Sequence, residues 1–165
     1  MVLQDSVMIQ AAPGATFRFF EEMEANYFEC HPDHVLFQWV SGRGVKEGNV
    51  FYFEEYIRGK LLKKRVVFTR VIPNRHIEFA PTFWLMRFFL PRMLFRIERE
   101  SEGCQFIAEI HLRLGPLARR ANAKDLDAVR EHMRVEGVNI KRIVEANADR
   151  PARRSWRSEM SGKAE

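Results

Sequence analysis

The sequence has few of the features that mark small secreted or membrane-spanning proteins. Its 165 residues include two cysteines, Cys30 and Cys104, which do not make a disulfide framework. We find no N-terminal segment that combines a basic start, an apolar run and a small-residue cleavage site. The longest apolar stretch, residues 82–90, is interrupted by Arg87 and is far shorter than the roughly 20 residues that span a bilayer. We therefore expect a cytoplasmic protein without stable membrane insertion.

The chain also lacks a strong excess of one charge. Its formal net charge is +5, and residues of both signs are interspersed over most of the sequence. Part of the basic excess lies at the end of the chain, in Arg150, Arg153, Arg154, Arg157 and Lys163. Such a segment is typical of a solvated terminus. We therefore expect residues 149–165 to form a disordered basic tail, and we expect no nucleic-acid binding.

Residues 1–148 show no internal repeat and no interdomain linker, so we expect them to form one domain. A short strand pattern at Val7–Ala11 precedes helical spacing over Ala15–Ala25, and a long amphipathic helix over Asp125–Ala148 closes the domain. The alternating pattern of strands recurs between these helices, at His34–Val40, Val50–Arg58, Leu61–Ile72, His76–Phe79, Leu94–Glu100 and Gln105–Leu114.

Consecutive strands with short connections predict an antiparallel sheet, and the closing helix must bury its apolar stripe against that sheet. The predicted fold is an α+β domain in which a curved sheet of six or seven strands wraps around the C-terminal helix. Such a sheet can enclose a cavity, and aromatic residues, which make up 12% of the chain, suit its lining. The aromatic segment at residues 81–91 has two readings, a lid over this cavity or ordinary core.

One acidic residue interrupts the apolar stripe of the closing helix. Glu136 lies on this stripe, and His132 precedes it by one helical turn, so the two side chains project together. A carboxylate on a buried face is costly unless a charge, a metal or hydrogen bonds satisfy it. The apolar residues of the stripe are Leu126, Val129, Met133, Ile140 and Ile143.

Polar residues on two other segments can reach the same space as this His–Glu pair. Glu55 lies on the apolar face of its strand, although a bulge would turn Glu54 inward instead. The segment HPDH offers His31 and His34, and His31 could also simply cap the turn. Two histidines and two carboxylates from separate elements suit zinc or another divalent transition metal. For the helical pair alone, a solvated or hydrogen-bonded pair is the simpler reading.

The order of elements and several segments resemble a known superfamily. The alanine–proline turn at residues 12–13, the block FQWVSGRGVKEGNVFYFEEYIRG and the closing helix are similar to START and Bet v 1-like helix-grip proteins over Ser6–Ala148. Within that superfamily, HPDH at 31–34, Glu55 and HMRVE at 132–136 resemble the zinc-dependent phloretin hydrolase and diacetylphloroglucinol hydrolase branch. Those enzymes cleave a carbon–carbon bond between a phenolic ring and an acyl group with a metal inside the cavity.

The resemblance implies a helix-grip fold and a metal-dependent hydrolase of an aromatic or acyl-phenolic, polyketide-like small molecule, acting through metal-activated water or carbonyl polarisation. Glu136 or Glu55 would move protons, and Tyr27, near the HPDH segment, would donate a hydrogen bond to a substrate oxygen. The known hydrolases carry an additional N-terminal portion, so the substrate is not carried over. The implied ligands of Zn²⁺, or of another divalent transition metal, are His34, Glu55, His132 and Glu136, with His31 as the alternate for His34.

Two other functions remain open for the same cavity. One is a metal-free carrier or sensor of a small hydrophobic or aromatic ligand, and the other is a polyketide cyclase or aromatase. A homodimer is an open alternative to a monomer. We expect His111 to face solvent, opposite the apolar face of its strand, and His76 to be structural beside Glu78. A basic strand end is expected to be a solvated hairpin and comprises Arg58, Lys60, Lys63, Lys64 and Arg65.

Overall fold

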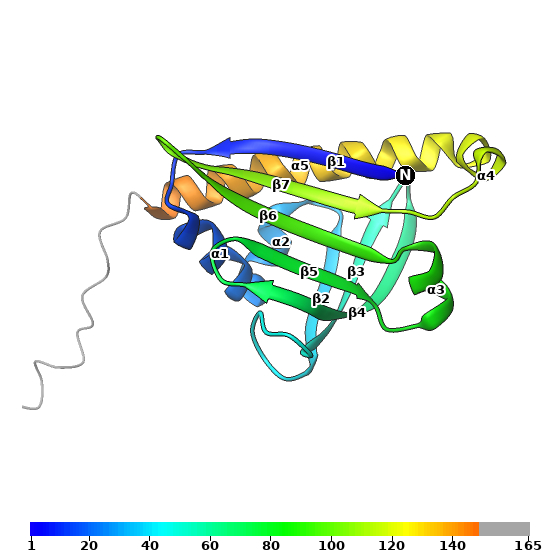
Figure 1. The fold of residues 1–165 in the computed structure, drawn as a ribbon, viewed down its shortest axis with the longest axis horizontal. Coiled ribbons are helices and arrows are strands. Elements are labelled where there is room, and N and C mark those ends of the chain that lie inside the picture. The colour runs from blue at the N-terminus through cyan, green and yellow to red at the C-terminus, as the bar shows by residue number, and fades with distance from the viewer. Residues whose placement is uncertain (149–165) are drawn as a thin grey trace, which may run out of the picture.

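The computed structural model describes residues 1–148, which form a curved sheet of seven strands, one long helix and four shorter helices (Figure 1). The predicted tail at residues 149–165 lies outside the described residues. In chain order the elements are β1 (Val2–Ile9), α1 (Pro13–Glu21), α2 (Met23–Cys30), β2 (His34–Ser41), β3 (Val50–Ile57), β4 (Lys60–Ile72), β5 (His76–Pro81), α3 (Trp84–Phe89), β6 (Arg92–Glu100), β7 (Gly103–His111), α4 (Pro116–Ala121) and α5 (Ala123–Ala148).

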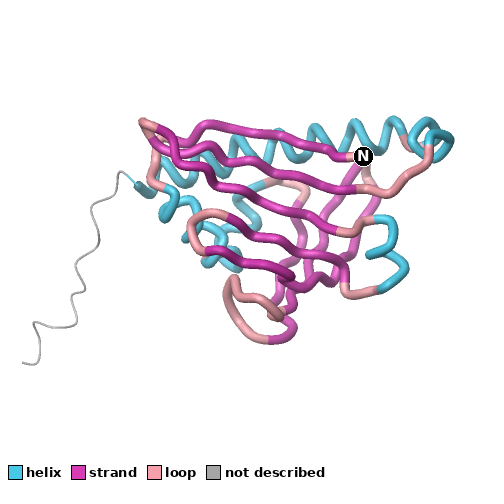
Figure 2. The backbone as a smooth tube through the Cα atoms, in the orientation of Figure 1, coloured by secondary structure: helices cyan, strands magenta, loops and turns pink. Residues whose placement is uncertain are grey.

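The strands form one antiparallel sheet in the order β1-β7-β6-β5-β4-β3-β2. Strands β2 to β7 follow one another as neighbours, whereas β1 returns to pair with β7. Helix α5 runs along this curved layer (Figure 2) and packs against β1 at one edge, against β7, and against β3 near the other edge. This arrangement confirms the predicted α+β helix-grip fold.

The turn between β6 and β7 requires glycine. Gly103 has a φ of +143°, and a Cβ at this position would lie 2.1 Å from the carbonyl oxygen of Ile9. Since β1 pairs with β7 from Val2 to Ile9, the end of β1 runs directly against this turn. A glycine is therefore needed both for the backbone conformation and for the close approach of β1.

The predicted helix over Ala15–Ala25 is wrong in its extent, because the chain forms two helices there. Helix α1 ends at Glu21, and α2 begins at Met23. Glu22 between them has φ −96° and ψ 22°, which departs from helical geometry. The break lets α2 carry Tyr27 and Cys30, both buried, into the interior.

Most of the aromatic segment at residues 81–91 is not core, although Pro81 at its start is fully buried and Leu90 packs against the core. It contains α3, none of whose residues is buried, and none of them lines the cavity described below. The hydrophobic core lies instead between the sheet and helices α1, α2 and α5. Among residues 1–148, no helix combines the length and the apolar character that crossing a membrane would demand.

Candidate functional site

A cavity of about 150 Å³ lies between the inner face of the sheet and helices α2 and α5. Its wall is mainly apolar and rich in aromatic rings, because the inward positions of five consecutive strands carry phenylalanine. These residues are Phe51 and Phe53 in β3, Phe68 in β4, Phe79 in β5, Phe95 in β6 and Phe106 in β7. Neighbouring rings of this set lie in contact, with centroid separations such as 4.9 Å between Phe51 and Phe68. The cavity therefore offers a flat-sided, apolar space.

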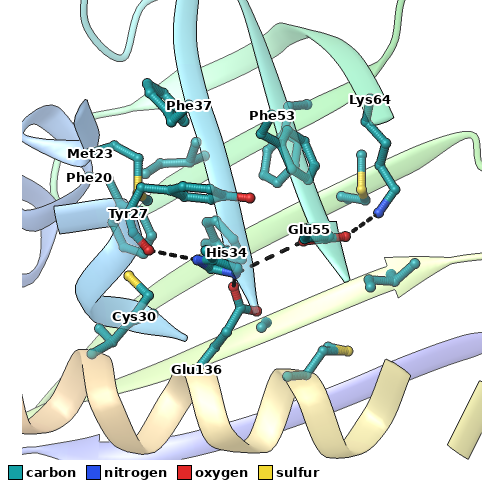
Figure 3. Close-up of a pocket in the computed structure, with 18 of the residues that line it drawn as sticks. Phe20, Met23, Tyr27, Cys30, His34, Phe37, Phe53, Glu55, Lys64 and Glu136 are labelled. Atoms are coloured by element: carbon teal, nitrogen blue, oxygen red, sulfur yellow. Dashed lines mark hydrogen bonds and ion pairs between the residues drawn. The ribbon is translucent and has the colours of Figure 1, made fainter. Parts of the chain in front are cut away.

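Four titratable side chains from three elements meet in the wall of the cavity. Figure 3 shows three of them, His34, Glu55 and Glu136. Nε2 of His34 lies 3.0 Å from Oε1 of Glu136, 3.3 Å from Nε2 of His132 and 4.0 Å from Oε2 of Glu55. Nε2 of His132 lies 3.8 Å from Oε2 of Glu55 and 4.0 Å from Oε1 of Glu136. The structure thus brings together the four residues that the sequence predicts as metal ligands. We call them the His–Glu cluster.

Glu55 reaches the cluster because of strand periodicity. Phe51, Phe53 and Glu55 are buried on the same face of β3. Glu54 points the other way, where its carboxylate accepts a hydrogen bond from the hydroxyl of Tyr52. The alternative that Glu54 turns inward is therefore wrong, and the irregular register lies in β2 rather than in β3.

His34 is held in place by a hydrogen bond and by ring stacking. Its Nδ1 donates to the backbone carbonyl of Tyr27 at 2.6 Å, and the ring of Tyr27 stacks on the imidazole with centroids 4.0 Å apart. Because Nδ1 carries the proton for this bond, Nε2 is directed into the cluster. Burial opposes a charge on His34, but the hydrogen bond to Glu136 and the charge of that residue raise the pKa of His34 above its ordinary value.

Glu136 points its carboxylate toward His34 across the end of the cavity (Figure 3). Burial alone would raise the pKa of Glu136, but the hydrogen bond to His34 and the nearby imidazoles hold it below its ordinary value. The side chain is 29% accessible and lines the cavity, so it is half-buried rather than exposed on the outer surface. The pKa directions of the two partners agree with an ion pair between His34 and Glu136.

Lys64 completes the site and was missed by the sequence reading, which assigned it to a solvated hairpin. Its Nζ lies 2.6 Å from Oε1 of Glu55 and 5.2 Å from the centroid of the Phe53 ring, and its side chain is only 18% accessible. The alternation of β4 could have predicted that Lys64 points inward, because Leu62, Lys64 and Val66 fall on one face. Pairing of Lys64 with Phe53 puts it beside an inward residue.

His31 and Tyr27 are close to the cluster but have partners of their own. The buried His31 stacks on His132 with centroids 3.8 Å apart, and its Nδ1 accepts a hydrogen bond from the backbone N–H of Asp33. Burial and the neighbouring imidazoles lower the pKa of His31. Tyr27, predicted as a hydrogen-bond donor to substrate, donates its hydroxyl to the backbone carbonyl of Glu54 at 3.2 Å. Burial and the nearby carboxylates raise its pKa.

Two groups of side chains in residues 1–148 have possible ligand atoms within 4.8 Å of one another. One is His34, Glu55 and His132, all buried, and the other is His31, Asp33 and His132, in which Asp33 is exposed. His34 lines the cavity and His31 does not, so the geometry favours His34 over its alternate.

The expectation for His111 needs a correction. It does not line the cavity, as its place opposite Phe106, Ala108 and Ile110 predicts. Its side chain is nevertheless only 19% accessible, because its Nε2 lies 2.9 Å from Oε2 of Glu109. This contact with Glu109 partly covers the imidazole.

Solved structures share this fold. TTHA0849 from Thermus thermophilus has a TM-score of 0.72 and 14% identity, with 90% of this chain and 99% of that chain covered. The Zhui aromatase/cyclase from Streptomyces sp. R1128 has a TM-score of 0.69 and 11% identity, covering 89% and 94%. The ginseng major latex-like protein 151 from Panax ginseng has a TM-score of 0.66 and 13% identity, covering 91% and 98%.

At these identities the similarity shows the fold alone, which is the Bet v 1-like, polyketide-cyclase type of helix-grip fold. The sequence matches no family model, and no curated protein is significantly similar to it. The predicted helix-grip fold is confirmed. The closer resemblance to the zinc-dependent hydrolases stays a prediction.

Proposed function

We propose that the cavity binds a small aromatic or otherwise apolar compound, and that the His–Glu cluster receives the polar end of that compound. The observation that carries this proposal is an aromatic cavity that ends at buried titratable side chains. An apolar pocket with a few convergent polar groups is the usual form of a small-molecule site. The aromatase/cyclase among the similar structures supports this class of function.

We further propose that the cluster binds Zn²⁺ or another divalent transition metal. Nitrogen and oxygen ligands lie about 2.0–2.2 Å from zinc, so donor atoms around a tetrahedral ion are about 3.3–3.6 Å apart. The separations that involve a histidine of the cluster range from 3.0 to 4.0 Å and bracket that spacing. The bond from His34 Nδ1 to a backbone carbonyl is also the arrangement that orients metal-bound histidines. His34, Glu55 and His132, whose ligand atoms all lie within 4.8 Å of one another, therefore fit such an ion, and Glu136 lies beside this group through His34.

The metal-dependent reaction that this site could perform is hydrolysis of an acyl-phenolic compound. A bound metal would supply Lewis acidity at the polar end of the cavity. Glu136, whose Oε1 lies 3.0 Å from Nε2 of His34, is placed to take up or release a proton when it is not itself a ligand. The phenylalanine wall would hold the ring of the compound and exclude water from it.

A metal-free cyclase or ligand carrier is the second candidate, and a different observation favours it. Each carboxylate of the cluster already has a basic partner, since Glu136 pairs with His34 and Glu55 pairs with Lys64. A buried charge with such a partner does not require an ion. The solved structures named above favour this candidate over the hydrolase, because one of them is an aromatase/cyclase. In this function His34 and Glu136 would act as the acid–base pair.

Binding of two matched probes tests the proposed ligand class. We expect 2-naphthol to displace 8-anilinonaphthalene-1-sulfonate from the protein at about tenfold lower concentration than naphthalene. A hydrogen bond to a charged group contributes about 1.5 kcal/mol, which corresponds to that factor. The variant Glu136→Leu restores the apolar stripe and should abolish the preference for 2-naphthol. Fluorescence titration of the dye measures both.

His76→Ala is the control for this experiment, because His76 does not line the cavity. It should keep the wild-type preference. Equal displacement by the two probes in the wild type, or an unchanged preference in Glu136→Leu, would contradict the proposed role of the cluster. Failure of both probes to displace the dye would contradict ligand binding in the cavity.

A further inference from the structure

Helix α3 and the residue before it expose large apolar side chains that the cavity does not use. Their accessible fractions run from 38% for Met86 to 73% for Trp84, and none of them lines the cavity. Contiguous exposed apolar surface of this kind marks an interaction site. We call this surface the α3 patch, and it comprises Phe83, Trp84, Leu85, Met86, Phe88 and Phe89.

Helix α4 lies at the same end of the molecule as α3 (Figure 1). The loop before α4 is fixed to α3, because the backbone N–H of Arg113 donates to the carbonyl of Phe89 at 2.8 Å. The guanidinium of Arg113 also lies 5.7 Å from the centroid of the Phe88 ring. In α4, Leu117 is 85% accessible. Apolar and cationic groups are therefore in contact on this surface.

The charged side chains of the segments that contain α3 and α4 are basic. Residues 79–95 and 110–124, which include α3 and α4, contain no aspartate or glutamate. The carboxylates that flank these segments have basic partners, since Glu78 lies near Arg92, Glu109 pairs with Arg96, and Asp125 pairs with Arg58. The cations within the two segments are Arg87, Arg92, Arg113, Arg119, Arg120 and Lys124.

We propose that the α3 patch docks on the surface of an anionic lipid bilayer. Tryptophan and other aromatic side chains favour the headgroup region, and each basic residue near an anionic leaflet contributes about 1 kcal/mol. The aliphatic Leu85 and Met86 suit acyl chains rather than nucleobases. A second copy of this chain would place like charges face to face, which opposes association. The docking is peripheral and independent of the proposed ligand in the cavity.

Sedimentation of the full chain with phosphatidylcholine vesicles, with and without phosphatidylglycerol, tests this proposal. The wild type should bind the anionic vesicles, and bind them less as salt rises. Trp84→Ser/Phe88→Ser should lower the partition coefficient at least tenfold, and Arg119→Gln/Arg120→Gln should lower it severalfold. Phe28→Ser is the matched control, because Phe28 in α2 is 52% accessible and Phe88 is 54% accessible.

Three results would overturn the proposal. The first is a wild type that does not bind anionic vesicles. The second is Trp84→Ser/Phe88→Ser binding as well as the wild type, which would assign binding to another part of the chain. The third is a wild type that does not bind vesicles but forms a dimer in light scattering, with the dimer abolished in Trp84→Ser/Phe88→Ser. Thermal unfolding and 2-naphthol displacement should be unchanged in the variants, which separates this test from that of the cavity.

Discussion

Glu136 lies where the apolar stripe of α5 would otherwise carry a leucine, and its main partner comes from another element. The spacing along the helix points to His132, but Oε1 of Glu136 is 4.0 Å from His132 and 3.0 Å from His34. A carboxylate at this position is therefore satisfied across the cavity rather than along the helix. Helical spacing identifies the unusual residue, and only the folded structure, in which the His34 side chain at the start of β2 reaches α5, identifies its partner.

Glu55 and Lys64 show what strand periodicity can and cannot predict. The inward direction of Glu55 follows from the alternation of β3 alone. Lys64 obeys the same rule in β4, but it lies in a run of cations that reads as solvated surface. Its burial depends on pairing with Phe53, a register that the sequence does not specify. A run of cations can therefore contain a half-buried lysine, which only the register of the sheet identifies.

The pair formed by Lys64 and Glu55 gives a prediction at the scale of single residues. Lys64→Met removes the partner of a buried carboxylate and should lower the free energy of unfolding by about 3 kcal/mol. The double variant Lys64→Met/Glu55→Leu should recover most of this loss, because no unpaired charge remains. Urea unfolding in the presence of EDTA measures both, with Lys63→Met as the exposed control. Additive effects of the two substitutions would contradict a direct coupling.

At the scale of elements, the strands are predicted better than the short helices. Period-two alternation locates all of β2 to β7, because each strand buries one face against the core. The break between α1 and α2 at Glu22 has no proline or glycine to mark it. Helix α3 is apolar in composition yet exposed, so its residues read as core or lid. A local sequence pattern identifies apolar residues, but it does not show whether another element of the fold buries them.

The turn at Gly103 supplies a prediction for the β6–β7 hairpin. Gly103→Ala should destabilise the protein by about 3 kcal/mol, because it adds a disfavoured backbone conformation to a clash with β1. Gly115→Ala is the matched control, since a Cβ added there would meet no heavy atom within 4 Å and its φ of −69° suits alanine. Thermal unfolding would show the difference. Equal stability of the two variants would mean that β1 can move away from the turn.

For the whole molecule, the order of strands and the closing helix are enough to predict the helix-grip fold. The cavity follows from the same order, because α5 bridges β1 and β3 while aromatic side chains fill only part of the space between. The convergence of four polar residues at one end was predicted as a set, although their roles stay a prediction. The exposed α3 patch could not be predicted, because its exposure depends on the arrangement of the complete sheet.

Metal titration of the untagged full chain tests the central claim, that the His–Glu cluster binds a divalent transition metal. After dialysis against EDTA and then buffer, calorimetry with Zn²⁺ should show about one equivalent bound, and Co²⁺ should give visible absorption typical of nitrogen and oxygen ligands. His76→Ala should bind equally, and His132→Ala should lose the site. Absence of stoichiometric binding in the wild type, or unchanged binding in His132→Ala, would contradict the assignment of a metal to this cluster.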